Sequence, residues 1–240
     1  MEEWHLSNRA IQLLNDCIFF VQSRLSQPCL LCGATVQGDH LCPGCRDDLP
    51  RLPEGRCPQC ALPSHGGAVC GNCLRHAPAF DPTEAVYAYD FPLDALVKHC
   101  KYQGALEVTA FFAREMATQV AKRDRADVII PMPLHPGRLG ERGFNQAAEI
   151  ARRLSRQVRI PWLPHICRRV RDTPPQAGLN LKARRRNLRG AFLCEGDLSG
   201  KRVALVDDVM TSGTSLNELA RTVKKAGAAS VTAWVVARTL

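Results

Sequence analysis

The sequence predicts an α/β protein, in which a parallel sheet covered by helices follows a smaller cysteine-rich module. Two observations lead to this prediction. Apolar strand-like runs alternate with helix-like segments from residue 81 onward, and eight of the 12 cysteines fall between Cys29 and Cys73. The 240 residues are enough for a small module beside a medium-sized domain.

Composition excludes several classes of protein. Hydrophobic residues make up 45% and charged residues 23% of the chain, which excludes wholesale disorder and a coiled coil. No run approaches the roughly 20 apolar residues of a membrane-spanning helix. Glu2 and Glu3 are acidic where a secretory signal is basic, and the apolar run 17–21 is too short for its hydrophobic region. We therefore expect a cytoplasmic protein in a reducing compartment, without a membrane span.

The net charge of +9 is concentrated in the second part of the chain. Residues 1–80 carry six basic and seven acidic side chains. Residues 81–240 carry 26 basic and 16 acidic side chains. Between Arg168 and Arg189, eight basic residues stand against one acid, Asp172. Such a segment indicates an anionic partner, either phosphate groups or nucleic acid, or else an arginine-rich solvated face.

The cysteines of the N-terminal part form four CxxC pairs with regular spacing. Nine residues separate the first pair from the second, and nine separate the third from the fourth. Two CxxC turns complete the tetrahedral thiolate shell that structural zinc prefers. The equal spacers favour two sites in series, while a cross-braced pairing of first with third and second with fourth stays open. The predicted ligands of two structural zinc ions are Cys29, Cys32, Cys42, Cys45, Cys57, Cys60, Cys70 and Cys73.

These patterns divide the chain into three predicted segments. Residues 1–26 are expected to form an amphipathic helix, because Ile11, Leu14 and Ile18 recur at helical spacing. Residues 27–80 form the cysteine-rich module and residues 81–240 the α/β domain. Within the α/β domain we expect strands at 85–90, 127–131, 202–206 and 231–236, and helices at 93–102, 106–122, 143–157 and 214–225. In such sheets, ligands bind beyond the carboxyl ends of the strands.

The strand that begins near residue 202 is followed by a polar loop with a distinct chemistry. Asp207 and Asp208 come first, then Thr211-Ser-Gly-Thr-Ser215 at the start of a helix. The loop N–H groups and hydroxyls at the positive end of the helix form a phosphate cradle. The carboxylates would repel phosphate unless they bind hydroxyl groups of the same ligand or hold its metal ion, and a sugar 5-phosphate meets that requirement. The alternative is an ordinary loop capped by Thr214, which explains only one of the polar residues.

Further motifs resemble those of the ComF family, and within it of GntX-like proteins, over nearly all of residues 27–240. The CxxC pairs are similar to the family's double zinc ribbon, and Lys101-Tyr102 is similar to its Lys-aromatic motif. The segments 131–134 and 142–146 together resemble its second motif. The third motif is matched by Gln176, Leu179, Arg185, Asn187, Ala191 and Phe192. The resemblance implies a type I phosphoribosyltransferase fold that binds 5-phosphoribosyl diphosphate with Mg²⁺.

The resemblance also implies the roles of individual residues. Asp207 and Asp208 are the expected catalytic carboxylates, and arginines near the 131–134 turn neutralise the departing diphosphate. The basic segment is expected to be a flexible loop that closes over the diphosphate, with contacts from Lys182, Arg184, Arg185, Arg186 and Arg189. The expected ligand-binding residues are Lys101, Pro131, Met132, Pro133, Arg138, Arg142, Arg185, Asp207, Asp208, Val209, Met210, Thr211, Ser212, Gly213, Thr214 and Ser215.

Three functions remain open at this point: a phosphoribosyltransferase of unknown acceptor, a ligand sensor without turnover, and a factor in DNA uptake or utilisation. The third follows from the association of ComF relatives with natural competence, and its partners would be single-stranded DNA or competence proteins. Because no aromatic residue lies between Trp162 and Phe192, the basic segment favours diphosphate over nucleic acid. A homodimer is one expected assembly. Residues 1–80 are expected either to form a hood over the acceptor, which would lie near Lys101 and Tyr102, or to dock elsewhere as a partner-binding arm.

Overall fold

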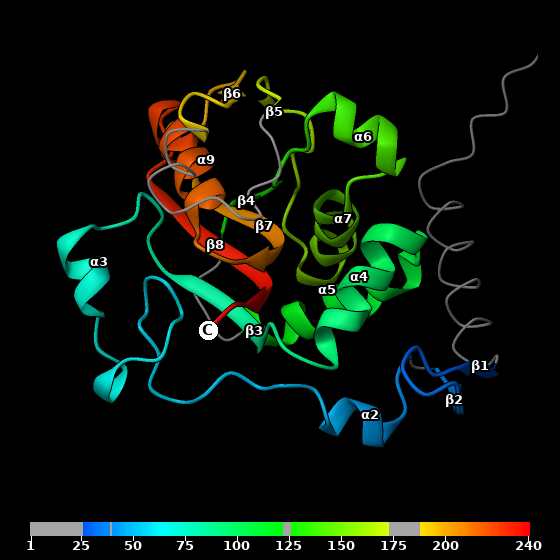
Figure 1. The fold of residues 1–240 in the computed structure, drawn as a ribbon. Helices are drawn as coiled ribbons and strands as arrows, with labels where there is room; N and C mark the ends of the chain where they lie inside the picture. The colour runs from blue at the N-terminus through cyan, green and yellow to red at the C-terminus, as the bar shows by residue number, and fades with distance from the viewer. Residues whose placement is uncertain (1–25, 39, 122–125, 173–187) are drawn as a thin grey trace, which may run out of the picture. The chain divides into compact units, whose positions relative to one another are not determined.

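The computed structural model describes residues 26–38, 40–121, 126–172 and 188–240 (Figure 1). The chain divides into two compact units, residues 1–48 and 49–240. The predicted helix over residues 1–26 lies outside the described part, apart from Ser26. Among the described residues, no helix combines the length and the apolar character that crossing a bilayer requires.

The first unit contains a small cysteine-rich fold. Strands β1 (Ser26–Pro28) and β2 (Thr35–Gln37) pair in antiparallel register, and the short helix α2 (Pro43–Asp47) follows. Cys29, Val36 and Leu41 are buried. Within residues 26–38 and 40–48, the buried side chains are too few to provide much hydrophobic stabilisation, and folds of this size usually need a bound metal.

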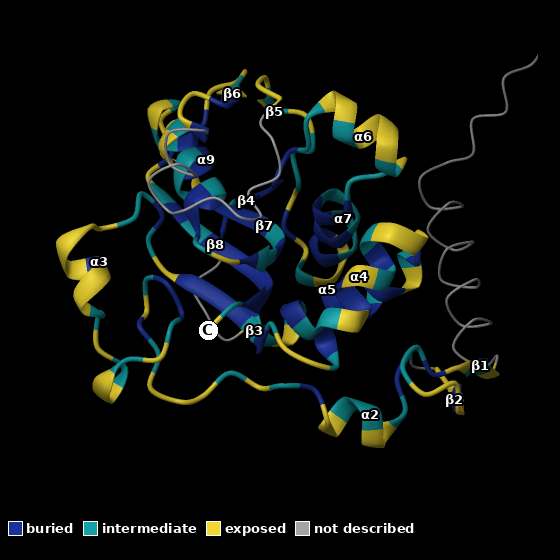
Figure 2. Cartoon of the chain, in the orientation of Figure 1, coloured by how far each residue is buried: buried dark blue, intermediate teal, exposed yellow. Residues whose placement is uncertain are grey.

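The second unit is built on a four-stranded parallel sheet, as the sequence predicted. Its order is β3 (Thr83–Ala88), β8 (Ser230–Arg238), β7 (Arg202–Met210), β4 (Val128–Pro131). The two central strands are the longest, and Figure 2 shows them buried along most of their length. Parallel strands covered on both faces are expected to be apolar throughout, and β4 is buried at each position.

Helices cover the two faces of this sheet. On one face lie α5 (Leu106–Val120) and α7 (Gln146–Val158), with α4 (Leu93–Gln103) packed beside α5. On the other face α9 (Thr214–Lys225) packs on alternate residues of the central strands, such as Leu205 and Ala233. The antiparallel pair β5 (Cys167–Arg169) and β6 (Phe192–Cys194) flanks the undescribed residues 173–187.

Several boundaries differ from the sequence prediction, and two of the differences concern the candidate site. Strand β7 continues past Val206 through both aspartates to Met210, because β8 extends alongside it with Asp207 opposite Val235. The predicted helix at 143–157 begins only at Gln146. A separate helix α6 (Pro136–Arg142) ends at Gly143, which has a left-handed φ of 79°, and Asn145 then caps α7 by accepting N–H bonds from Ala147 and Ala148.

The second half of the cysteine-rich module belongs to the sheet unit. It comprises Cys57 to Cys73, with the short helices η1 (His65–Gly67) and α3 (Gly71–Arg75). Cys57, Cys60 and Cys73 are part of the same hydrophobic core as the strands and α9. The division after Asp48 therefore falls inside the predicted 27–80 module.

Candidate ligand site and metal centres

Two clusters of four cysteines form in series along the chain. In each cluster, the four Sγ atoms lie within 4.8 Å of one another, which suits the tetrahedral shell of structural zinc. The pairing is sequential, and the cross-braced alternative is excluded. We call these clusters the first ribbon (Cys29, Cys32, Cys42 and Cys45) and the second ribbon (Cys57, Cys60, Cys70 and Cys73).

Backbone donors favour the thiolate form in both ribbons. The Cys42 N–H donates to Cys29 Sγ at 3.4 Å, and the Cys70 N–H donates to Cys57 Sγ at 3.3 Å. Burial alone would raise the pKa of Cys29, but N–H groups, including those of Cys32 and Cys42, outweigh it and lower the pKa to about 6. The same balance lowers the pKa of Cys57 to about 7. Burial and the neighbouring cysteines instead raise the pKa of Cys45 in the first ribbon and of Cys73 in the second. One thiol of each ribbon is thus favoured as the thiolate, which is the metal-binding form, and a bound ion would draw the others into that form.

Two carboxylates and an ammonium group meet near the carboxyl end of β7. Lys101 Nζ, from the end of α4, lies 2.8 Å from Asp208 Oδ2. Burial, followed by the negative charge of Asp208, raises the pKa of Asp207, since a single lysine does not balance two carboxylates. Burial of Lys101 would lower its pKa, but Asp208 outweighs burial and raises it. The ion pair of Lys101 with Asp208 is thus the charged part of this cluster, and the Asp207 carboxyl beside it is held toward its neutral form.

The phosphate loop, residues 211–215, follows directly and leads into α9. Gly213 has a left-handed φ of 71°, which strains any other residue, and a Cβ there would also displace the Met210 methyl group, 2.6 Å away. The hydroxyls of Ser212 and Thr214 are 2.8 Å apart. Gly213 rather than Thr214 occupies the N-cap, and as a glycine it supplies no capping side chain. Ser212 Oγ accepts a long hydrogen bond of 3.4 Å from the Thr214 N–H. The loop thus leads into the N-terminus of a helix, where backbone N–H groups can bind an anion.

The turn after β4 is packed rather than open. Pro131, Met132 and Pro133 are buried. The Met132 N–H donates to Val206 O at 2.8 Å, and Met132 O accepts from Asn145 Nδ2 at 3.0 Å. Both backbone groups of Met132 are thus used within the protein. Contact between this turn and diphosphate stays a prediction.

The arginines predicted for diphosphate lie on and beside α6. The Arg142 Nη1 donates to Gln146 Oε1 at 2.7 Å, and its guanidinium stacks 5.9 Å from the Tyr102 ring centroid. The predicted contacts Lys182, Arg184, Arg185 and Arg186 lie outside the described residues, as do the motif positions Gln176, Leu179 and Asn187. Phe144, in the motif segment 142–146, is half-buried.

One residue beside the site was not predicted. Arg169 ends β5, and burial together with the positive charge of Arg138 lowers its pKa, while Asp172 and Asp207 act in the opposite direction. Arg138, Arg169 and Asp207 are thus neighbours although they come from three elements. The sequence signal was the Arg168-Arg169 pair, but which arginine faces inward depends on strand alternation.

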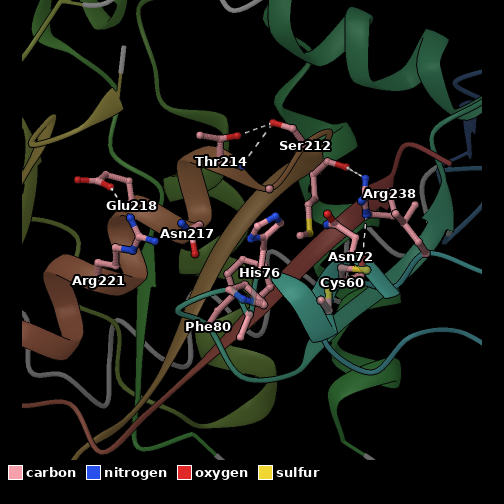
Figure 3. Close-up of a pocket in the computed structure, with 16 residues that line it drawn as sticks. Cys60, Asn72, His76, Phe80, Ser212, Thr214, Asn217, Glu218, Arg221 and Arg238 are labelled. Carbon is pink, nitrogen blue, oxygen red and sulfur yellow. Dashed lines mark hydrogen bonds and ion pairs between the residues drawn. The ribbon is translucent and has the colours of Figure 1, made fainter. Parts of the chain in front are cut away.

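A pocket of about 260 Å³ lies between the second ribbon and the phosphate loop (Figure 3). Its walls include His76 and Phe80 from the chain after the ribbon, and Ser212 and Asn217 from the loop and α9. Asp207, Asp208, Lys101 and Tyr102 do not line it. The acceptor position predicted near Lys101 and Tyr102 is therefore distinct from this pocket.

Models of two known domains match the N-terminal and the C-terminal parts of the chain. A model of the double zinc ribbon domain matches residues 21–74, and a model of the phosphoribosyl transferase domain matches residues 140–239. Competence protein F of Haemophilus influenzae is 35% identical over 85% of this chain and 92% of its own length. DNA utilization protein YhgH of Escherichia coli O157:H7 is 34% identical over 88% of this chain and 97% of its own length.

Among solved structures, a purine phosphoribosyltransferase from Pyrococcus horikoshii is 21% identical, with a TM-score of 0.35, and the match covers 54% of this chain and 81% of that one.

Proposed function

This chain belongs to the ComF family, and from that premise we propose that it binds 5-phosphoribosyl diphosphate and serves DNA uptake or DNA utilisation. The observation that carries the ligand proposal is the carboxylate pair Asp207-Asp208 directly before the phosphate loop. A phosphate cradle beside two acids suits a ligand with an anionic end and a neutral polyol. Ribose 5-phosphate has both.

In this proposal, each part of the ligand has its own partners. The loop from Thr211 to Ser215 binds the 5-phosphate through N–H groups and hydroxyls. Asp207 and Asp208 accept hydrogen bonds from the ribose hydroxyls, with Val209 and Met210 as the backbone between them and the loop. Arg138, Arg142 and, as an addition, Arg169 bind the diphosphate. Lys101 holds Asp208 ionised and oriented through its 2.8 Å ion pair.

The residues at this edge also fit a magnesium ion. Mg²⁺ prefers oxygen ligands from one or two carboxylates and from substrate phosphates, and Asp207 and Asp208 supply the carboxylates. Burial, followed by the negative charge of Asp208, raises the pKa of Asp207, and a divalent cation bound here would favour the ionised form of both carboxyls. When bound, the ion would supply electrostatic stabilisation of the diphosphate.

The proposed reaction is glycosyl transfer to a nitrogen nucleophile. The bond between ribose C1 and the diphosphate oxygen breaks, its electron pair leaves with diphosphate, and the acceptor nitrogen forms the new bond to C1. The protein's work is positioning and electrostatics. The carboxylates of Asp207 and Asp208 offset positive charge on the ribose ring, and the arginines offset negative charge on the leaving group.

The alternative is a member that binds the ligand, or single-stranded DNA, without turnover. A specific observation favours it: the turn 131–133 is buried and the backbone groups of Met132 are hydrogen-bonded inside the protein. Backbone at that turn would otherwise be the natural cradle for diphosphate. The basic segment between Arg168 and Arg189 would serve either anion.

Calorimetry of the full chain with 5-phosphoribosyl diphosphate and Mg²⁺ tests the ligand proposal. We expect Asp208→Asn to weaken binding by about tenfold or more and to reduce the discrimination between ribose and deoxyribose phosphates, since a hydrogen bond to a charged group contributes about 1.5–3 kcal/mol. The matched control is Asp127→Asn, which neutralises a carboxylate at the opposite edge of the sheet, paired with Arg202. Equal affinities for wild type and Asp208→Asn would refute the assignment.

Release of diphosphate across a panel of nitrogenous bases then separates the two functions. Release that depends on one base indicates a transferase. Tight binding without release for any base supports the sensor.

A further inference from the structure

Arg238, the last residue of β8, connects the second ribbon with the phosphate loop (Figure 3). Its side chain is 4% exposed. The Nε donates to Cys60 O at 2.7 Å, and Cys60 is a predicted zinc ligand. The Nη1 donates to Met210 O at 3.0 Å and also to Thr211 O, the first carbonyl of the phosphate loop. One planar guanidinium therefore fixes both segments relative to each other.

The zinc-binding turn of the second ribbon is built into the sheet through three consecutive carbonyls. Pro58 O accepts from the Thr83 N–H at 2.9 Å, and Gln59 O accepts from Thr83 Oγ1 at 2.5 Å. Cys60 O is the acceptor for Arg238. These three carbonyls can point at their donors only while the turn keeps the shape that binds metal. A change in the shape of the turn would therefore disturb its contacts with both the edge strand β3 and the phosphate loop.

Elsewhere the second ribbon and the loop are separated by the 260 Å³ pocket. The other polar link across it is indirect: the Ala79 N–H donates to Asn217 Oδ1 at 2.7 Å, which ties the chain after the ribbon to the first turns of α9. In the described part of the chain, Arg238 and Asn217 thus provide polar contacts between the second ribbon, the chain after it and the loop region, beside the apolar packing of Phe80 and Met210.

Charge supports the same connection. A divalent ion with four thiolates has a net negative charge, and Arg238 is a buried cation beside Cys60. Two buried opposite charges with satisfied hydrogen bonds stabilise each other, whereas removal of one leaves the other buried and uncompensated. Loss of the metal cluster would therefore also leave Arg238 without its counter-charge.

We propose that the second ribbon, when it holds metal, sets the conformation of the phosphate loop, and that Arg238 is the positioning residue that transmits this effect. The proposal rests on the proposed function for the identity of the ligand, 5-phosphoribosyl diphosphate. The coupling itself concerns the chain alone: metal in the second ribbon and an ordered loop stabilise each other. By reciprocity, a ligand in the loop raises the affinity of that ribbon for metal.

Hydrogen exchange on the full chain tests the coupling without any ligand. Cys73→Ser removes a ligand of the second ribbon, and we expect amides of residues 210–217 to exchange about tenfold faster. Cys45→Ser is the matched control, because it removes the equivalent ligand of the first ribbon, in the other compact unit. Equal exchange at 210–217 in the two variants would overturn the proposal.

A second variant guards against simple unfolding of Cys73→Ser. Arg238→Gln keeps all eight cysteines and is expected to retain two zinc ions per chain by metal analysis. We expect the same faster exchange at 210–217 and about tenfold weaker binding of 5-phosphoribosyl diphosphate, with Arg238→Lys intermediate. Arg238→Gln with wild-type exchange and affinity would refute the role of Arg238.

The two proposals fail differently. If wild type does not bind 5-phosphoribosyl diphosphate, the proposed function fails, while faster exchange at 210–217 in Cys73→Ser and Arg238→Gln still supports the coupling. If the ligand binds but does not raise the affinity of the second ribbon for zinc in an equilibrium competition with a chromophoric chelator, the coupling fails and the proposed function stands.

Discussion

The two ribbons have nearly the same sequence pattern and the same internal geometry, but the structure uses them differently. In each, the Sγ atoms of the second and third cysteines lie 3.7 Å apart, and a five-residue helix follows the third cysteine. In the first ribbon only Cys29 is buried, whereas in the second ribbon Cys57, Cys60 and Cys73 are buried within the core of the sheet. The comparison teaches that a repeated metal motif can form a small unit in one copy and part of a domain core in the other.

A single backbone position shows how closely the two turns match. The residue after each first CxxC pair has a left-handed φ: 75° at Gly33 and 57° at Ala61. In both turns its N–H donates to the carbonyl of the first cysteine at 2.9 Å. Glycine adopts this φ without strain, but alanine does not. The methyl group of Ala61 is buried in the core, which offsets that cost in the second ribbon.

The largest expected difference follows from removal of equivalent ligands. Cys57→Ser should destabilise the whole sheet unit by about 4 kcal/mol, roughly 10 °C in its melting temperature, because it removes metal from a site inside the shared core. Cys29→Ser should leave the calorimetric transition of the sheet unit within about 1 °C and affect only the first unit. Equal shifts of that transition for the two variants would show that the ribbons are equivalent after all.

An intermediate effect is expected where the second ribbon meets the edge strand. Thr83→Val removes the hydroxyl that donates to Gln59 O while keeping the side-chain shape, and should cost about 1 kcal/mol in urea denaturation. Thr83→Ser retains the hydroxyl and is the matched control. If Thr83→Val matches wild type in stability and in the rate of zinc release, the turn does not depend on this contact.

The smallest expected effect concerns the left-handed position. A Cβ at position 33 would have no other atom within 4 Å, so the Gly33→Ala substitution introduces backbone strain but no steric clash. This strain alone should weaken zinc binding in the first ribbon by about 1 kcal/mol. Ala61→Gly relieves the same strain but exposes a gap in the core, and should change stability by less than about 0.5 kcal/mol. A chelator competition on each variant measures both. A larger loss for Ala61→Gly would mean that burial outweighs strain.

Local patterns predicted a large part of this structure. The CxxC spacing indicated two sites in series, and the alternation of apolar runs with helical periodicity predicted the parallel sheet and the helices α4, α5 and α9. These features depend on residues close together in the chain, so they are visible without knowing what packs against them. The Asp207-Asp208 pair and the loop after it are equally local.

Tertiary structure decided which of these parts meet. The length of β7 depends on the register with β8, and Lys101 pairs with Asp208 because α4 ends above that strand edge. The docking of the second ribbon depends on Thr83 and Arg238, which lie 26 and 181 residues beyond Cys57 in the chain. Neither residue stands out in the sequence, since a threonine in a strand and an arginine near its end are common. A sequence records which contacts each residue type can make, but the partner that each one finds is set by the packing of distant elements around the sheet.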